Sequence, residues 1–144
     1  MTHVHTTCYI DTFIAVAPDS TAPGGLVPPS GSNPSVAART FEMIADAPYR
    51  HTSDDVIFTV WADRNSILEA DRERAREEFF SKPKACLRAS DLGKKYGWGV
   101  HSDSDGRVAV YALGSAEYET FASGLSPFTG APVSVKNAMR SARR

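Results

Sequence analysis

A turn between two short apolar runs constrains this fold more than any other part of the sequence. Residues 98–102 and 107–113 carry Val and aromatic residues, and they flank Asp103-Ser104-Asp105-Gly106. Asp and Gly tolerate the positive φ angles of tight turns, so the pattern predicts a β-hairpin. Hairpin strands pair antiparallel, and a largely antiparallel sheet is therefore expected.

The length of this turn decides which side chains share a face of the hairpin. A loop of two or four residues would place Trp98, Val100, Ala109 and Tyr111 on one face and His101, Val108 and Val110 on the other. A three-residue loop with a bulge would break that register, because side chains alternate between faces with a period of two. Both alternatives are compatible with the sequence.

The remaining segments predict an α+β domain in which helices pack on this sheet. Residues 9–17 predict a first strand, and residues 56–61, apolar on both faces, predict an interior strand covered on two sides. Parallel pairing is the alternative to the antiparallel arrangement. Three helices are predicted, from a cap at Ser32 or Asn33 to Pro48, from about residue 66 to residue 80, and from a Ser115 cap to about residue 123.

Two segments are predicted to lie outside these elements. Residues 18–33 are rich in Pro and Gly, which predicts a flexible surface loop that serves as a flap. Residues 133–144 form a basic C-terminal tail. The organisation is thus one domain, residues 1–144, with one long loop and one tail.

Length and cysteine content favour a single cytoplasmic domain. The chain has 144 residues, 42% of them hydrophobic, which is enough for one core. Cys8 and Cys86 are too few for the disulfide framework of a small secreted protein. The apolar run at residues 9–17 is too short to span a bilayer and no Lys or Arg precedes it. Neither export nor membrane insertion is therefore expected.

The charges divide unevenly along the chain. Residues 1–81 carry six Arg and twelve acidic residues, net −6, whereas residues 82–144 carry ten Lys or Arg and five acidic residues, net +5. A basic half favours an anionic ligand if folding keeps its cations together.

Six blocks of sequence together resemble a known family. They are YIDTFI at residues 9–14, TSDD at 52–55, EFFSK at 78–82, RAS at 88–90, KKYGWGVH at 94–101 and AMRS at 138–141. Through these blocks most of the chain resembles an uncharacterised microbial protein family, domain of unknown function 6157. The resemblance implies a single soluble domain and brings no activity with it.

Cations and a hydroxyl gather around a predicted turn just before the hairpin. Arg88, Ser90 and Lys94 can hold a phosphate or carboxylate there through charge-assisted hydrogen bonds. Tyr96 and Trp98 would form an apolar wall beside the anion. We therefore expect these five residues to bind a small anionic or phosphorylated molecule.

An alternative account gives the same cations a structural role. Arg88 would then pair with an acid such as Asp54 or Asp55, and the lysines would be solvated. In the binding hypothesis, by contrast, the loop of residues 18–33 covers the ligand.

The enzyme hypothesis adds His101 as a general acid or base in the same pocket, because imidazole titrates near neutral pH. It requires His101 to share a cavity with Arg88. Otherwise His101 packs beside Val108 as an ordinary core histidine. Cys86 is interpreted as a small buried residue, with a reactive thiolate as the alternative.

No metal or other cofactor is predicted. Asp54 and Asp55 are adjacent and would point to opposite faces of a strand, so a turn at Ser53 or Asp54 is the favoured interpretation. His3 and His5 have no Cys or acidic residue at ligand spacing.

A third hypothesis is an interaction module for protein or nucleic acid. Aromatic rings and tail cations could contact bases and phosphates; they are Tyr96, Trp98, Tyr111, Tyr118, Lys136, Arg140, Arg143 and Arg144. A core-lining hairpin followed by a frayed basic terminus would have the same composition. The sequence leaves the oligomeric state open.

Overall fold

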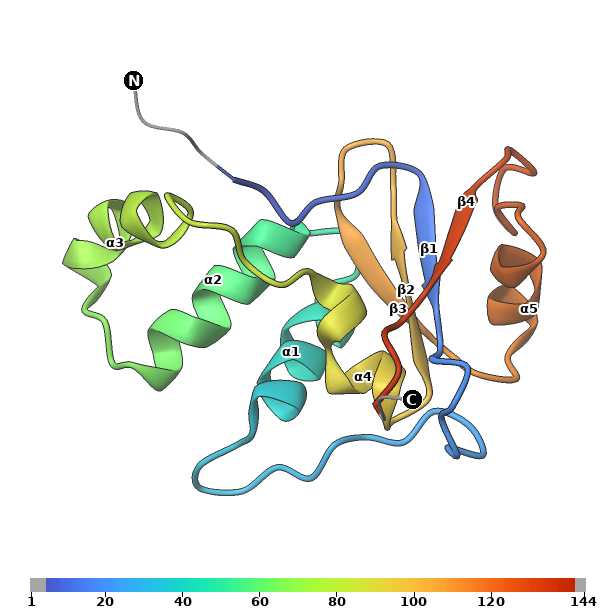
Figure 1. The fold of residues 1–144 in the computed structure, drawn as a ribbon, viewed down its shortest axis with the longest axis horizontal. Helices are drawn as coiled ribbons and strands as arrows, with labels where there is room; N and C mark the ends of the chain where they lie inside the picture. The colour runs from blue at the N-terminus through green and yellow to red at the C-terminus, as the bar shows by residue number, and fades with distance from the viewer. Residues whose placement is uncertain (1–4, 142–144) are drawn as a thin grey trace.

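A four-stranded sheet forms the centre of the protein in a computed structural model that describes residues 5–141 (Figure 1). Its strands are β1 (Thr12–Ala15), β2 (Trp98–Ser102), β3 (Val108–Ala112) and β4 (Ser134–Asn137). They lie in the order β3-β2-β1-β4, with β1 antiparallel to β2, β2 antiparallel to β3, and β1 parallel to β4. The prediction of a single α+β domain with a largely antiparallel sheet is confirmed, with a parallel pair at one edge.

Helices cover both faces of this sheet. Figure 1 shows α1 (Val36–Ala45), α2 (Ser53–Arg64) and α4 (Asp91–Lys94) on one side and α5 (Ala116–Ala122) on the other. The remaining α-helix of the described residues, α3 (Arg72–Phe79), packs on α2 away from the sheet. Two short 3₁₀ turns, η1 (Glu69–Asp71) and η2 (Leu87–Ala89), precede α3 and α4.

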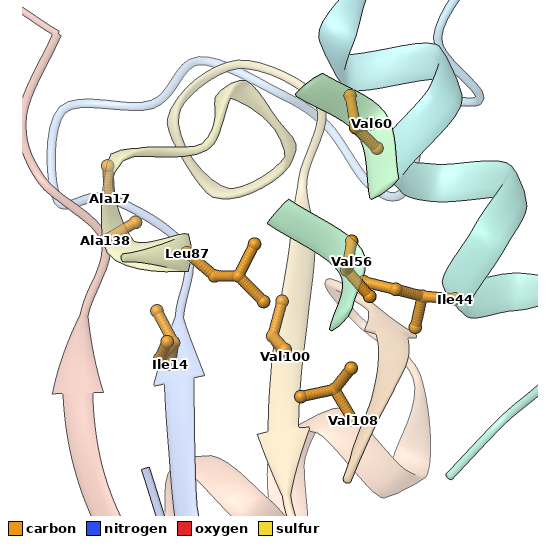
Figure 2. Packing of buried hydrophobic residues seen from close by; sticks show 9 residues of the cluster. All are labelled: Ile14, Ala17, Ile44, Val56, Val60, Leu87, Val100, Val108 and Ala138. Atoms are coloured by element: carbon orange, nitrogen blue, oxygen red, sulfur yellow. The ribbon is translucent and has the colours of Figure 1, made fainter. Parts of the chain in front are cut away.

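Alternation along the strands divides the core into two layers. On the α1 and α2 side, Ile14 and Val100 of the sheet meet Ile44, Val56 and Leu87, as Figure 2 shows. On the α5 side, Phe13 stacks on Phe121 with 5.1 Å between ring centroids. Burying each such side chain contributes about 1.5–3 kcal/mol, so both layers are substantial sources of stability.

The predicted hairpin is present, and its turn is the three-residue alternative. Asp103 N–H donates to Arg107 O at 2.9 Å, which leaves residues 104–106 as the loop, and Gly106 has a φ of 79°. Val100 consequently pairs with Val110, and His101 pairs with Ala109. The faces predicted for a two- or four-residue loop are therefore wrong, and His101 and Tyr111 lie on the same face.

The predicted interior strand at residues 56–61 is wrong, because these residues belong to helix α2. The helix begins with a capping box: Thr52 Oγ1 accepts from Asp55 N–H at 3.1 Å, and Thr52 N–H donates to Asp55 Oδ2 at 3.0 Å. These two bonds satisfy the backbone N–H groups of Thr52 and Asp55 at the start of the helix. They therefore favour a helix over an extended segment. Asp54 and Asp55 are accordingly helical residues, not a turn before a strand.

Helix α2 lacks one apolar stripe because it is covered on several sides. Val56 and Val60 face the sheet, whereas Phe58 and Ala62 pack against Phe79 and Phe80 of the α3 region. A helix surrounded in this way has apolar residues around most of its circumference. Over six residues that pattern is the same as the pattern of a strand buried on both faces.

The other predicted helices are present with different boundaries. Ser35, not Ser32 or Asn33, caps α1 by accepting from Ala38 N–H at 3.1 Å. The helix predicted from about residue 66 is interrupted, and α3 begins only at Arg72. Ser115 caps α5 as predicted.

The segment predicted as a basic tail begins as part of the sheet. Strand β4 pairs with β1, Thr12 opposite Ser134, and Ala138 N–H donates to Ala15 O at 2.7 Å. Residues 18–33 contain no helix or strand, as expected for the loop. Within residues 5–141, no helix is both long enough and apolar enough to cross a bilayer.

The helical state of α2 gives a test of the capping box. Thr52→Ala should lower the free energy of unfolding by about 1 kcal/mol, because it removes the acceptor for Asp55 N–H. Thr59→Ala, in the middle of the same helix, should change it by less than about 0.5 kcal/mol, since Ala is the better helix former. Urea denaturation measures both values. A larger loss for Thr59→Ala than for Thr52→Ala would contradict the helix and favour a strand.

Candidate functional site

The residues predicted to bind an anion do not converge on one hollow. Arg88 Nε donates to Asn137 O at 2.8 Å, and Met139 N–H donates to Arg88 O at 2.8 Å. Arg88 therefore links the η2 turn to the end of β4. Ser90 caps α4 by accepting from Leu92 N–H at 3.1 Å, and Lys94 is a half-buried residue at the end of that short helix.

The alternative pairing of Arg88 with Asp54 or Asp55 is wrong. Asp54 Oδ1 accepts from both the backbone N–H and the hydroxyl of Thr7, each at 2.7 Å. Asp55 forms an ion pair with Arg76 at 2.9 Å. Burial raises the pKa of Asp55, but the Thr52 N–H and the Arg76 guanidinium outweigh it and leave this pKa below its ordinary range.

The long loop lies over Tyr96 and Trp98, and both residues serve to anchor it. Leu26 N–H donates to Tyr96 O at 2.8 Å, and Trp98 Nε1 donates to Leu26 O at 2.9 Å. Gly97, at a φ of 77°, leaves room for the loop backbone, because a Cβ there would collide with Gly24 O. Neither aromatic ring lines either of the two cavities described below.

The first cavity, of about 440 Å³, lies between α1, α2 and residues 84–90. Most of its wall is apolar and comes from Val36, Ile57, Val60, Trp61, Phe79 and Leu87. The polar lining consists of Thr40, Arg64, Asn65, Lys84, Cys86 and Ser90, with no acidic residue. Ser90 is the one predicted ligand-binding residue among the described residues that line it.

Two cations, Lys84 and Arg64, line this otherwise largely apolar cavity. Lys84 Nζ lies 4.3 Å from the centroid of the Phe79 ring, so its ammonium sits at the edge of the apolar wall. Arg64, the last residue of α2, is exposed at the same cavity. Sequence reasoning missed Arg64, because residues 56–61 were predicted to form a strand and the helix that ends at Arg64 was not recognised.

Cys86 lines the same cavity and contacts a tyrosine. Its Sγ lies 3.4 Å from the Tyr9 hydroxyl, and the residue is half-buried. The hydrogen bond to Cys86 and burial raise the pKa of Tyr9, against the opposing effect of Arg88. The hydroxyl of Tyr9 therefore stays protonated near neutral pH and can donate to the sulfur.

The second cavity, of about 270 Å³, contains His101 but not Arg88. His101 Nδ1 is 2.8 Å from the Tyr49 hydroxyl, which is in turn 2.8 Å from the Tyr111 hydroxyl. The imidazole also stacks on Phe121 with 4.2 Å between centroids. The structure thus does not bring His101 and Arg88 into a shared pocket, which the enzyme hypothesis required.

Tyr49 reaches His101 because its segment extends the sheet beyond β3. Tyr49 N–H donates to Val108 O, and Val108 N–H donates to His51 O, both at 2.9 Å. Sequence reasoning missed Tyr49, which follows Pro48 in a connection with no repeating pattern. The corrected hairpin register brings Tyr111 to the same face as His101.

The surroundings keep this trio of side chains neutral. Burial lowers the pKa of His101 from its ordinary value of 6.5, and the carboxylates of Asp103 and Asp11 oppose that shift. Burial, followed by the neighbouring Tyr111 hydroxyl, raises the pKa of Tyr49. Near neutral pH the imidazole is therefore uncharged and the phenol protonated.

Comparison with known proteins gives one result. A model of DUF6157, a family of unknown function, matches residues 4–144. The chain belongs to this family. Neither the curated proteins nor the solved structures contain a match.

Other predicted sites are placed as follows. No cluster of three or more His, Cys, Asp or Glu suited to a metal occurs between residues 5 and 141. Tyr118 is 5% exposed and its hydroxyl accepts from Val16 N–H at 2.9 Å, so its ring offers no stacking surface. His3, Arg143 and Arg144 lie outside the described residues.

The burial of His101 predicts a pH-dependent stability. Unfolding restores an ordinary imidazole, so the unfolded chain takes up a proton more readily than the folded one. Stability should be highest above about pH 6.5 and fall as the pH drops toward the lowered pKa of folded His101. Urea denaturation across this range should show a shallower pH dependence for His101→Gln, with His51→Gln as the matched control. Parallel curves for wild type and His101→Gln would contradict this prediction.

Proposed function

We propose that this protein binds a small amphipathic anion, an apolar body with a carboxylate or phosphate head, in the cavity between α1, α2 and residues 84–90. The observation that carries the proposal is the composition of that cavity. Its walls are apolar, two cations border it, and no acidic residue lines it.

The apolar wall would supply most of the affinity. A volume of about 440 Å³ falls within the range of small-molecule sites, which are typically lined by apolar and aromatic side chains with a few polar groups. Each buried CH₂ group contributes about 0.8 kcal/mol. Ile57, Val60 and Trp61 present such a surface along α2, opposite Leu87.

The cations would orient the ligand and select its charge. Lys84 and Arg64 are exposed, so each ion pair with a ligand head group would be worth only about 0.2–1 kcal/mol. Ser90 and Asn65 add hydrogen-bonding groups to the same lining. An anionic head would therefore lie at the mouth of the cavity and an apolar tail inside it.

This proposal keeps the anionic ligand expected from the sequence and moves its site. The expected cations, Arg88 and Lys94, are replaced by Lys84 and Arg64, and Ser90 is common to both versions. Cys8 and Cys86 are free thiols, which favours the cytoplasm as the place where the ligand is met.

Three ligands with the same eight-carbon chain test the proposal: octanoate, 1-octanol and octylammonium. Equilibrium dialysis should give the highest affinity for octanoate and the lowest for octylammonium, because only the head group differs. Lys84→Gln should weaken octanoate binding about two- to fivefold, the loss expected for an exposed ion pair. Lys82→Gln, a nearby change outside the lining, should leave it unaltered.

Two results would count against this function. Equal affinities for octanoate and octylammonium would mean that the cations select nothing. Absence of binding by all three ligands would mean that the cavity is not a ligand site.

A further inference from the structure

The His101 cavity is a separate feature from the proposed anion site. The two cavities share no lining residue, and the second lies where β1 begins and β2 ends, beside residues 126–133. Its lining includes His101, Tyr49, Asp11 and Asp103, and no Lys or Arg. Its ligand would therefore differ in charge from that of the first cavity.

One nitrogen of the buried imidazole has no hydrogen-bond partner among the described residues. His101 is only 7% exposed, and Nδ1 is used by the Tyr49 hydroxyl. Nε2 has no hydrogen-bond partner within residues 5–141, yet no fully buried side-chain nitrogen or oxygen there lacks a partner. Nε2 therefore keeps some solvent exposure, and because His101 lines the cavity, a ligand bound there could complete its hydrogen bonding.

The hydroxyl chain allows Nε2 to act as an acceptor. If the Tyr49 hydroxyl donates to Tyr111, then Nδ1–H donates to Tyr49 and Nε2 carries the lone pair. The opposite orientation of the hydroxyls would make Nε2–H a donor. The charges around the cavity favour the first orientation, with Nε2 as an acceptor. The nearby carboxylates of Asp11 and Asp103 attract a ligand that donates a hydrogen bond.

The carboxylates of Asp103 and Asp11 differ in how firmly they are held. Asp103 Oδ1 accepts from the N–H groups of Asp105 and Arg107, both at 2.9 Å, so this side chain is fixed by the hairpin turn. Asp11 is exposed and opposite it, with Asp11 N–H donating to Asp103 O at 3.1 Å. Phe128, 62% exposed, adds an aromatic ring to the lining. An aromatic face and carboxylates together suit an organic cation.

The backbone is also unusual at this place. Of the three non-glycine residues with positive φ in the described chain, Asp11 (47°) and Tyr49 (59°) both line the cavity. Such conformations persist only where the surrounding structure holds them, and they concentrate at functional sites.

We propose that this cavity is a second ligand site and binds a small organic ammonium ion carrying an apolar or aromatic group. One N–H of the ammonium donates to His101 Nε2, and the carboxylates of Asp11 and Asp103 balance its charge. The apolar group lies against Phe128.

A matched set of benzyl compounds tests this site: benzylammonium, benzyl alcohol and benzoate. Binding is followed by the ¹⁵N resonances of the His101 ring nitrogens, identified by their loss in His101→Gln. Benzylammonium should shift the Nε2 resonance in a saturable manner, benzyl alcohol should bind more weakly, and benzoate should have no effect. Absence of any saturable shift with benzylammonium would overturn the proposal, as would an equal response to benzoate.

A pair of isosteric variants tests the role of charge. Asp11→Asn should weaken benzylammonium binding about two- to fivefold, the effect of removing one partly exposed charge partner. Asn is well suited to the positive φ at this position, so the variant should fold normally. Asp105→Asn, at the hairpin tip and outside the lining, should bind as wild type does, and so should Lys84→Gln. Equal effects of Asp11→Asn and Asp105→Asn would contradict a local contact.

Protonation of His101 gives an independent test. The titratable groups that face it are Tyr49, Tyr111, Asp11 and Asp103, while α5 presents the uncharged ring of Phe121. Benzylammonium keeps its charge between about pH 5 and about pH 8, whereas His101 loses its acceptor when it takes up a proton. Binding should weaken as the pH falls across that range. Binding that is constant with pH would contradict the contact to Nε2.

Discussion

The start of helix α2 is the constraint on which the rest of the structure depends. The capping box of Thr52 and Asp55 begins the helix, and Asp54 is held from the N-terminal segment by Thr7. Arg76 of α3 pairs with Asp55, so α3 is also attached at this point. Because α2 is helical, it closes the core against the sheet with Val56 and simultaneously presents Ile57, Trp61 and Arg64 to the first cavity.

The sheet was largely predictable, whereas the helix beside it was not. The turn residues of the hairpin act locally, and their signal is readable from the sequence. Residues 56–61 have apolar side chains around most of the helix because the sheet and the α3 region both cover it. Such an apolar run indicates that the segment is buried, but it does not distinguish a helix from a strand. The capping box just before this segment, Thr52 with Asp55 three residues later, was the signal that could have separated the two.

For the candidate functional residues, too, the sequence indicated the residue types but not which side chains would be in contact. His101 was recognisable as a titratable residue on the hairpin, but its partners depended on the length of one turn. A three-residue loop moved Tyr111 to the face of His101. Tyr49 joined them through a connection of irregular backbone. Similarly, Arg88 was recognisable as a cation, yet its partner, Asn137 O, belongs to a strand that the sequence suggested was a tail. Residue types were predictable here, and their juxtaposition was not.

The central claim is that α2 and residues 84–90 enclose a cavity for an amphipathic anion, and the two tryptophans of the chain test it most directly. Trp61 lines the cavity, whereas Trp98 Nε1 is bonded to Leu26 O elsewhere. Titration of ¹⁵N-labelled protein with octanoate should shift the indole N–H resonance of Trp61 in a saturable manner and leave that of Trp98 in place. A resonance of Trp61 that does not move at saturating octanoate, or one that moves no more than that of Trp98, would contradict the account.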